Sequence, residues 1–492
     1  MLLSELKVGL KYSSHTSQKK VGGSMKLTFA FYCVIGYLIA VTLAGLYYAR
    51  KVKTDEDYSV AGRSLPTIVL IGTLMATWMG AGTVLGGPAA TGYQFGIFAA
   101  VAFSLGSPVG QLILTFIAKR IRRLNAQTVP EVIELVYGPF ARIIATIIIA
   151  LAYIGIVAYQ YQGVGLILNS ILGIPVQMGT LIAFGVIVVT ALFGGLYSVA
   201  YTDFLSCIMM MAGLIIGVPM AISMAGGWSW VVANVPPTHF QVGGVTFTQL
   251  LGFFFPVFFY VMGDQNMYQR FFAARDEETA RKSGLGWMIG CLITYLFVAA
   301  GSITARALYP DIPAAQSFVH LASHGMPTVI GGICVAAIAA FIITTANSFL
   351  LSVGVNVSWD VYSRFINRQA STERKLFVSR ASVLGLGILA YVVIQYFPEL
   401  LILQQYTYTM YGAAITPVLI AAVIWPHRVT VAGGVTSILT GGIVTIAWEI
   451  AKRNGWAVAK TYPAVLIAAP LAIAALLFLQ KKGSTNTTSE VK

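Results

Sequence analysis

The second long apolar segment of this chain contains the stretch ATWMGAGTVLGGP at residues 76–88. Glycine is a poor helix former, and proline lacks the N–H that a helix interior needs. Four glycines and Pro88 fall within nine residues here, so the stretch predicts a helix broken near its middle. In a membrane span, such a break frees backbone carbonyls, which are hard oxygen ligands for Na⁺. The alternative interpretation is a small-residue face for close helix packing.

The composition of the whole chain indicates that this stretch lies in a membrane. Of the 492 residues, 57% are hydrophobic and 10% are charged, against roughly 25% charged in soluble domains. A membrane span needs about 20 mostly apolar residues. We predict an all-α polytopic membrane protein with 13 spans, at 27–49, 66–92, 95–118, 141–172, 176–195, 199–226, 246–270, 284–307, 327–358, 376–397, 399–425, 429–450 and 463–480.

The composition and the motifs exclude several classes of function. A chain this apolar is not a soluble enzyme, a secreted disulfide scaffold or a nucleic-acid-binding module. The sequence has no HExxH, P-loop or GxSxG motif, and we find no polar acid–base cluster in the spans. We therefore predict that the protein is not an enzyme. Its partners are expected to be the lipid bilayer and a small organic solute, without nucleic acid, and the sequence carries no signal for an oligomeric state.

The positive charges predict an orientation. With the N-terminus outside, 22 of the 31 Lys and Arg residues fall in cytoplasmic segments, as multi-pass proteins of the cell membrane favour. The net charge of +14 is then mainly a topology signal. Residues 1–24 are polar and predict a disordered extension, with Met25 as good a start as Met1. Residues 25–480 form one transmembrane domain, and 481–492 form a cytoplasmic tail.

The ninth predicted span carries polar residues inside an apolar helix. It reads AAFIITTANS at residues 339–348, and the polar stripe returns at Ser352 and Asn356 at near-helical spacing. Polar side chains at membrane depth are costly unless they line a cavity or bind something. The alternative is that the hydroxyls bond to carbonyls of their own helix.

Two further spans contain polar or irregular sequence. The sixth span includes Asp203, the acidic residue that we place inside a span on the cytoplasmic half. A carboxylate at this position would be protonated or bound to a cation. The alternative is that Asp203 only caps the helix. The seventh span is aromatic, with FFFPVFFY at residues 253–260, and it ends in GDQNMYQR at 263–270. Its Pro256 and Gly263 would permit a second break. An aromatic stripe of this kind is otherwise typical of lipid-facing or core packing.

Taken together, these segments resemble the sodium:solute symporter family. The matching motifs are DYSVAGR at 57–63, residues 76–86, residues 194–203, QNMYQRFFAA at 265–274, and the Thr344–Thr345 helix with its WDVY ending at 359–362. The match runs from Lys51 to about Pro426. The resemblance implies a leucine-transporter-type fold, an inverted five-plus-five helix repeat at about 66–226 and 246–425, with one extra helix before it and two after it.

The resemblance also implies a Na⁺ site between the first and eighth core helices. Carried over by position, its ligands are the carbonyls of Ala76, Met79 and Phe341 and the hydroxyls of Thr344 and Thr345. Some relatives bind a second Na⁺ with an aspartate, here Asp203, and hydroxyls one turn below the first site. The matching positions are Thr345, Asn347 and Ser348, and the amide at 347 departs from the all-hydroxyl pattern.

The solute pocket implied by the resemblance lies beside the broken helix. Its candidate residues are Thr77, Trp78, Thr83, Tyr159, Gln160, Phe255, Tyr260 and Thr409. Sugar carriers often have Asn, and proline carriers Asp, at the position of Trp78. We place no Arg or Lys at midplane depth, so a small neutral or zwitterionic solute is expected.

The predicted function is Na⁺-coupled symport of this solute into the cell by alternating access. One alternative is proton coupling, through titration of Asp203. The other is a Na⁺-permeable channel, which would need a continuous polar pore.

Overall fold

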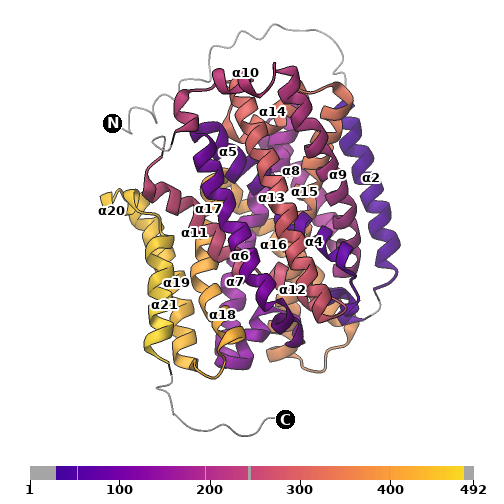
Figure 1. Cartoon of the computed structure of the whole chain (residues 1–492). Helices are drawn as coiled ribbons and strands as arrows, with labels where there is room; N and C mark the ends of the chain where they lie inside the picture. The colour runs from indigo at the N-terminus through magenta and orange to yellow at the C-terminus, as the bar shows by residue number, and fades with distance from the viewer. Residues whose placement is uncertain (1–28, 53, 194, 242–244, 398, 481–492) are drawn as a thin grey trace.

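The computed structural model of the chain describes residues 29–52, 54–193, 195–241, 245–397 and 399–480. Within these ranges the regular elements are helices (Figure 1). One isolated bridge joins Leu65 and Ala274. The extension predicted at 1–24 and the tail predicted at 481–492 lie outside the described residues. In chain order the elements are α2 (Phe29–Ala49), α3 (Asp55–Val60), η1 (Ala61–Arg63), α4 (Thr67–Trp78), η2 (Gly82–Gly86), α5 (Gly87–Phe95), α6 (Ile97–Arg123), α7 (Val129–Leu172), α8 (Val176–Phe193), α9 (Leu196–Met224), α10 (Trp228–Ala233), η3 (Pro237–Phe240), α11 (Phe247–Gly263), α12 (Gln265–Ala273), α13 (Glu277–Leu308), η5 (Ala314–Gln316), α14 (Ser317–His324), α15 (Thr328–Val355), η6 (Asn356–Ile366), α16 (Thr372–Tyr396), α17 (Leu400–Ala414), α18 (Thr416–Ile424), α19 (Val431–Arg453), α20 (Ala457–Thr461) and α21 (Val465–Phe478).

The described part of the chain has nine helical segments long and apolar enough to cross a membrane. The pair formed by α4 and the helical turns from Gly82 to Phe95 passes the same test together and is bent by 61°. Three shorter apolar helices, within α2, α8 and α21, follow the predicted order. The prediction of an all-α polytopic membrane protein is confirmed. The predicted count of 13 crossings requires the three shorter helices to cross as well.

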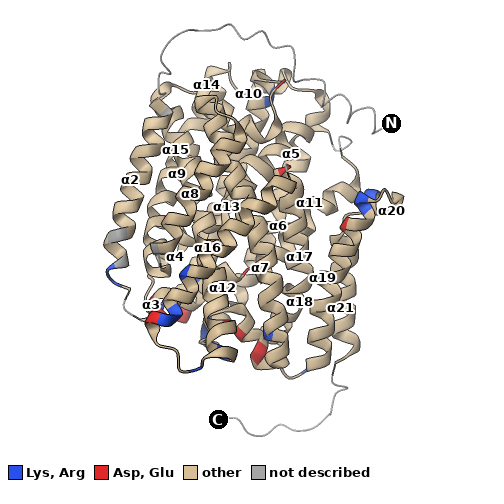
Figure 2. Cartoon of the chain, turned by 180° about the vertical axis from the view of Figure 1, so that it is seen from behind, with Lys and Arg blue, Asp and Glu red and all other residues tan. Residues whose placement is uncertain are grey.

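Charged side chains gather at one end of the bundle, the lower end in Figure 2. We call this the basic end and define it by Arg123, Arg275, Arg364 and Lys375. Ion pairs link its segments, among them Arg123 to Glu277 at 2.7 Å and Lys375 to Asp55 at 2.7 Å. Pairs near the surface contribute about 1 kcal/mol or less each, so the apolar interior carries most of the stability of the bundle.

The broken helix α4 occupies the interior of the bundle. It packs against α9, α13 and α15, and α15 in turn packs against α2, α7 and α9. From Gly331 to Val355, most residues of α15 are buried. Because polar side chains on α4 and α15 have no access to water, they must find partners on neighbouring helices. Thr77 on α4 and Ser348 on α15 meet in this way, with their hydroxyl oxygens 3.1 Å apart.

The predicted span at 141–172 lies within a longer helical segment. Segment α7 begins at Val129, because the Thr128 hydroxyl accepts the N–H of Glu131 and caps the helix at that point. Gly138, with φ 83° and ψ 176° and followed by Pro139, departs from helical geometry, so the segment is kinked there. Arg142 lies just after this kink, at the start of the predicted span.

Candidate functional site

The first broken helix is α4. It ends at Trp78, Met79 takes φ −94° and ψ 65°, and the following helical turns bend 61° away. A Cβ at Gly80 would lie 2.5 Å from the Gln160 amide nitrogen and 2.9 Å from the Thr345 methyl group. Glycine at this position therefore lets α7 and α15 approach the break closely. The predicted interruption of the second span is confirmed.

Oxygen atoms from α4 and α15 meet at this break. Thr345 Oγ1 donates a hydrogen bond to the carbonyl oxygen of Ala76 at 3.0 Å. Thr344 Oγ1 donates to the carbonyl of Phe341 in its own helix at 3.2 Å. These four residues and Met79 are buried. A hydroxyl also carries lone pairs, so rotation of its proton would offer the same oxygens to a hard cation.

Buried glutamines from α7 and α17 satisfy the backbone at the first break. Gln160 Oε1 accepts the N–H of Ala81 at 2.8 Å, and Gln404 Oε1 accepts the N–H of Gly87 at 3.2 Å. An unpaired N–H in this apolar interior would carry a large desolvation cost. The two amide side chains therefore stabilise the broken form of the helix.

Tyrosines from the same two helices satisfy a second break, between α11 and α12. Tyr411 on α17 donates to the carbonyl of Gly263 at 2.9 Å. Tyr153 on α7 donates to the carboxylate of Asp264 and accepts the N–H of Asn266 at 3.2 Å. On each helix the tyrosine and the glutamine are seven positions apart and so share one face. The breaks are thus held by matching faces of α7 and α17.

Aromatic rings pack beside the first break. The Trp78 ring stacks on Tyr260 and Tyr408 with centroid distances of 5.6 and 6.3 Å, and these two tyrosines stack on each other at 4.2 Å. Trp78 Nε1 donates to the hydroxyl of Tyr295 at 2.8 Å, and Trp287 meets Trp78 edge-on at 6.0 Å. We call these five residues the aromatic cluster. All are buried, so the cluster fills the space between α4, α11, α13 and α17.

A group of buried polar side chains lies between α4, α9 and α12. The Asp203 carboxylate accepts hydrogen bonds from Thr73 at 2.6 Å and from Thr77 at 3.2 Å, and it pairs with Arg270 at 3.2 Å. Arg270 also donates to Ser348 Oγ at 2.9 Å. Asp203 and Arg270 are fully buried. Asp203 therefore lies inside the bundle, as predicted, but the cation beside it is an arginine.

This arrangement corrects the placement of Arg270. The sequence analysis put it in a cytoplasmic segment and placed no arginine at depth, yet Arg270 lies on α12 and is fully buried. The cause is the break at Asp264, after which α12 continues inside the bundle. Asn347 is not brought to Asp203: its side chain accepts from Thr190 at 3.0 Å and lines a different cavity, between α2, α8, α9 and α15. Neighbouring residues on a helix point about 100° apart, which separates Asn347 from Ser348.

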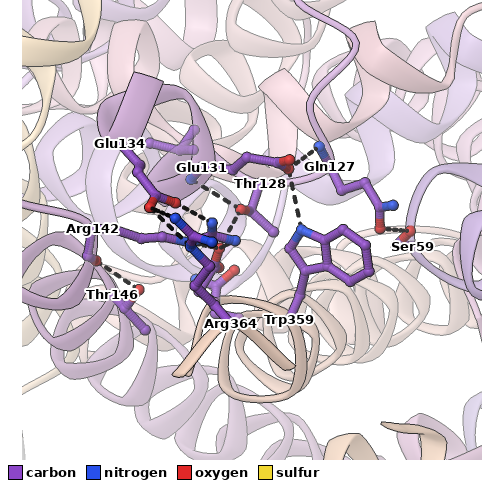
Figure 3. A network of polar contacts seen from close by, with 12 residues as sticks. Ser59, Gln127, Thr128, Glu131, Glu134, Arg142, Thr146, Trp359 and Arg364 are labelled. Atoms are coloured by element: carbon purple, nitrogen blue, oxygen red, sulfur yellow. Dashed lines mark hydrogen bonds and ion pairs between the residues drawn. The ribbon is translucent and has the colours of Figure 1, made fainter. Parts of the chain in front are cut away.

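A second buried polar network lies at the basic end (Figure 3). Arg142 on α7 donates to Asp360 on η6 at 2.8 Å and also pairs with Glu134. Thr128 donates to the same oxygen of Asp360 at 2.8 Å, and Arg364 pairs with Glu134 at 2.7 Å. The network joins the start of α7 to the end of the α15–η6 helix, so it ties two long helices together.

The comparisons with known proteins agree with this geometry. The profile of the sodium:solute symporter family matches residues 58–441, which is more than half of the chain. The chain belongs to the sodium:solute symporter family. As a member it is a Na⁺-coupled membrane transporter and not an enzyme. Na⁺ is its coupling ion.

Curated relatives of this symporter include two bacterial proline carriers. It is 28% identical over 435 residues to the high-affinity proline transporter PutP of Bacillus subtilis, with 82% of this chain and 89% of the relative covered. It is 25% identical over 458 residues to the sodium/proline symporter of Escherichia coli, with 86% and 88% covered.

Solved structures show the same fold. A Na⁺-coupled sialic acid symporter in its substrate-bound outward-open state aligns with a TM-score of 0.77 at 20% identity, covering 92% of this chain and 97% of that one. The nucleobase-cation-symport-1 family transporter Mhp1 aligns with a TM-score of 0.55 at 12% identity, covering 86% and 94%. The predicted leucine-transporter-type fold is confirmed, and the two breaks described above fall in the first helix of each predicted repeat.

The residues predicted to bind the solute fall into two groups. Trp78 and Tyr260 belong to the aromatic cluster, and the Tyr159 hydroxyl lies 3.4 Å from that of Tyr408. Thr77 and Gln160 are next to them, but their side chains are engaged by Asp203 and by the N–H of Ala81.

The other three predicted residues lie apart from the aromatic cluster or make no polar contact there. Phe255 stacks on Phe259 and packs with apolar residues of α19 and α21. Thr409 lines a cavity of about 280 Å³ between α11, α17, α19 and α20. It follows Tyr408 directly and so points to another side of α17. Thr83 is buried in the π-helical turn η2 after the break.

Several residues of the site were not found from the sequence. They are Gln404, Tyr408, Tyr411, Trp287, Tyr295, Asp264 and Arg270. Polar atoms within apolar spans are the signal that could have found Gln404 and Asp264. The tyrosines and Trp287 give no such signal, because aromatic residues are common throughout the spans, and only the packing of α11, α13 and α17 around α4 brings them together.

Proposed function

We propose that this symporter carries a compact zwitterionic solute with Na⁺ toward the basic end, which would face the cytoplasm. The observation that carries the proposal is the 3.0 Å contact between Thr345 Oγ1 and the carbonyl oxygen of Ala76. An ion bound by these two oxygens would join α15 to the broken helix. Its binding would thereby favour one arrangement of the two helices, which is what coupling requires. The carbonyls of Met79 and Phe341 and the hydroxyl of Thr344 would complete the site.

A zwitterionic solute is proposed rather than a net anion, because the basic side chain near the site is already paired. Arg270 is the basic side chain at this depth among the described residues, and its charge is compensated by Asp203. A net anionic solute would find no free counter-charge here. The aromatic cluster offers flat apolar faces for a small ring. Two relatives are named as proline carriers, so L-proline is the first solute to test.

The energetics of Na⁺ coupling suit the uptake of a dilute nutrient. One charge moving through 100 mV releases about 2.3 kcal/mol. A tenfold Na⁺ gradient adds about 1.4 kcal/mol. Together they would support roughly a 500-fold solute gradient for each ion carried.

The test is uptake by purified protein in proteoliposomes. Labelled L-proline is supplied at fixed pH, with Na⁺ or with choline outside and with the membrane potential clamped. We expect uptake that saturates with proline and falls at least tenfold in choline. Equal uptake in both solutions would contradict the proposal. A pH gradient imposed without Na⁺ should not replace the Na⁺ gradient, which separates Na⁺ coupling from proton coupling.

A further inference from the structure

The buried charges of the described residues do not balance. The buried acidic residues are three aspartates, and among lysines and arginines the buried residues are two arginines. Asp203 pairs with Arg270 at 3.2 Å, and Asp360 pairs with Arg142 at 2.6 Å. The third aspartate, Asp264, is fully buried and has no ion-pair partner within the described part of the chain. One carboxylate in the interior is thus left without a cation.

The local contacts of Asp264 leave one of its oxygens free. Oδ1 accepts hydrogen bonds from the Tyr153 hydroxyl and, at 3.2 Å, from the N–H of Asn266. Oδ2 is buried and has no hydrogen-bond partner. An ionised Asp264 would leave a buried charge uncompensated, and a protonated one would leave its O–H without an acceptor at Oδ2. Both forms are costly in an apolar interior, and a bound cation would relieve the cost.

Asp264 is also close along the chain to a residue of the aromatic cluster. It follows Tyr260 by one helical turn, at the break between α11 and α12. The buried hydroxyl of Tyr260 makes no hydrogen bond of ordinary geometry, but it interacts with the carboxylate of Asp264. Faces of aromatic rings attract cations, so the rings and the carboxylate favour the same kind of ligand.

We propose that Asp264 binds the positively charged amino group of the solute, with Tyr260 and the stacked rings of Trp78 and Tyr408 beside it. This inference rests on the proposed symport and narrows its solute class to molecules that carry an ammonium, iminium or quaternary ammonium group. Neutral polyols could donate hydrogen bonds to this carboxylate, but they would not compensate its charge. The same chemistry could serve a second Na⁺, so the experiment must separate the amine from the ion.

The experiment compares two ligands that differ in the amino group. L-proline and cyclopentanecarboxylate have similar five-membered rings, and cyclopentanecarboxylate lacks the amine. Binding to purified protein in saturating Na⁺ should favour proline by at least about 30-fold, since removing one partner of a buried charge pair costs 2–5 kcal/mol or more. In Asp264→Asn the preference should fall to within about threefold. Asp264→Glu keeps the charge and should keep most of the preference.

The controls separate the amine from Na⁺ and from general damage. Na⁺-induced thermal stabilisation without solute should have the same half-saturation in Asp264→Asn as in the parent. Asp360→Asn removes an equally buried carboxylate and should lower stability while the ligand preference stays. The inference is overturned if Asp264→Asn keeps the preference for proline, if it shifts only the Na⁺ half-saturation, or if the parent binds both ligands equally. A parent that binds proline without coupling it to Na⁺ would overturn the proposed function and leave this inference intact.

Discussion

Thr345 Oγ1 lies 3.0 Å from the carbonyl oxygen of Ala76, and this hydrogen bond connects the middle of α15 to the last turn of α4. Both residues are buried and lie at the point where α4 breaks. The separation of these two oxygens must change whenever α4 tilts against α15. A cation that binds both oxygens would therefore bind one arrangement of the helices better than another, and that difference in affinity is the physical basis of coupling.

Replacing Thr345 tests this contact directly. Thr345→Ala removes one ligand oxygen, so the Na⁺ concentration for half-maximal uptake should rise at least tenfold, while Thr345→Ser keeps the oxygen and should stay close to the parent. Thr445→Ala is the matched control, because that buried hydroxyl only bonds the carbonyl of Gly441 in its own helix at 2.8 Å. Equal Na⁺ activation curves for the alanine variant and the parent would remove Thr345 from the site.

The buried pair of Asp203 and Arg270 predicts a non-additive effect on stability. Asp203→Asn alone leaves the guanidinium uncompensated in the interior, which typically costs 3–5 kcal/mol, so thermal unfolding in detergent should begin at a clearly lower temperature. The double variant Asp203→Asn with Arg270→Met removes both charges and should recover most of the loss. A double variant no more stable than Asp203→Asn would show that charge compensation is not the role of Arg270.

The sequence predicted the broken helix but not the side chains that stabilise the break. Glycine and proline content is a local property, so the break after Trp78 could be predicted from residues 76–88 alone. The partners of the break come from α7 and α17, which are far away in the sequence. That Gln404 meets Gly87 and that Tyr411 meets Gly263 depends on how these helices pack. For the same reason the hydrophobic pattern placed Arg270 at a span end, because it does not show that the span bends inward at Asp264.

Trp78 should determine how tightly the solute binds. Trp78→Ala removes the ring that stacks on Tyr260 and Tyr408, so the concentration of proline for half-maximal uptake should rise at least tenfold. Trp78→Phe keeps a ring and loses only the hydrogen bond to Tyr295, so its effect should be smaller. Trp425→Ala serves as the control because that ring is exposed. An unchanged proline dependence in Trp78→Ala would place the solute elsewhere.

His239 predicts an acid-sensitive stability. It lies on η3, between α10 and α11, and its Nε2 is 3.0 Å from the carbonyl oxygen of Tyr93. Burial lowers the pKa of the imidazole below its usual value of 6.5. The unfolded chain then binds a proton more readily than the folded protein, so stability is complete above about pH 6.5 and falls as the pH drops through the lowered pKa. The temperature of unfolding should decline below that pH, and His239→Gln should decline less; equal slopes would contradict the assignment.

Arg142 and Arg364 allow a comparison between two arginines that pair with the same glutamate. Arg142 is 4% exposed and also donates to Asp360, whereas the Arg364 side chain is 39% exposed and pairs with Glu134 alone. Water screens the exposed pair, so Arg364→Met should change the free energy of unfolding by no more than about 1 kcal/mol. Arg142→Met leaves the carboxylate of Asp360 buried and uncompensated, and it should cost about 3–5 kcal/mol. Unfolding followed by denaturant or heat measures both variants under the same conditions. If the two losses were equal, the tie between α7 and η6 would depend on Glu134 rather than on the burial of Arg142 and Asp360.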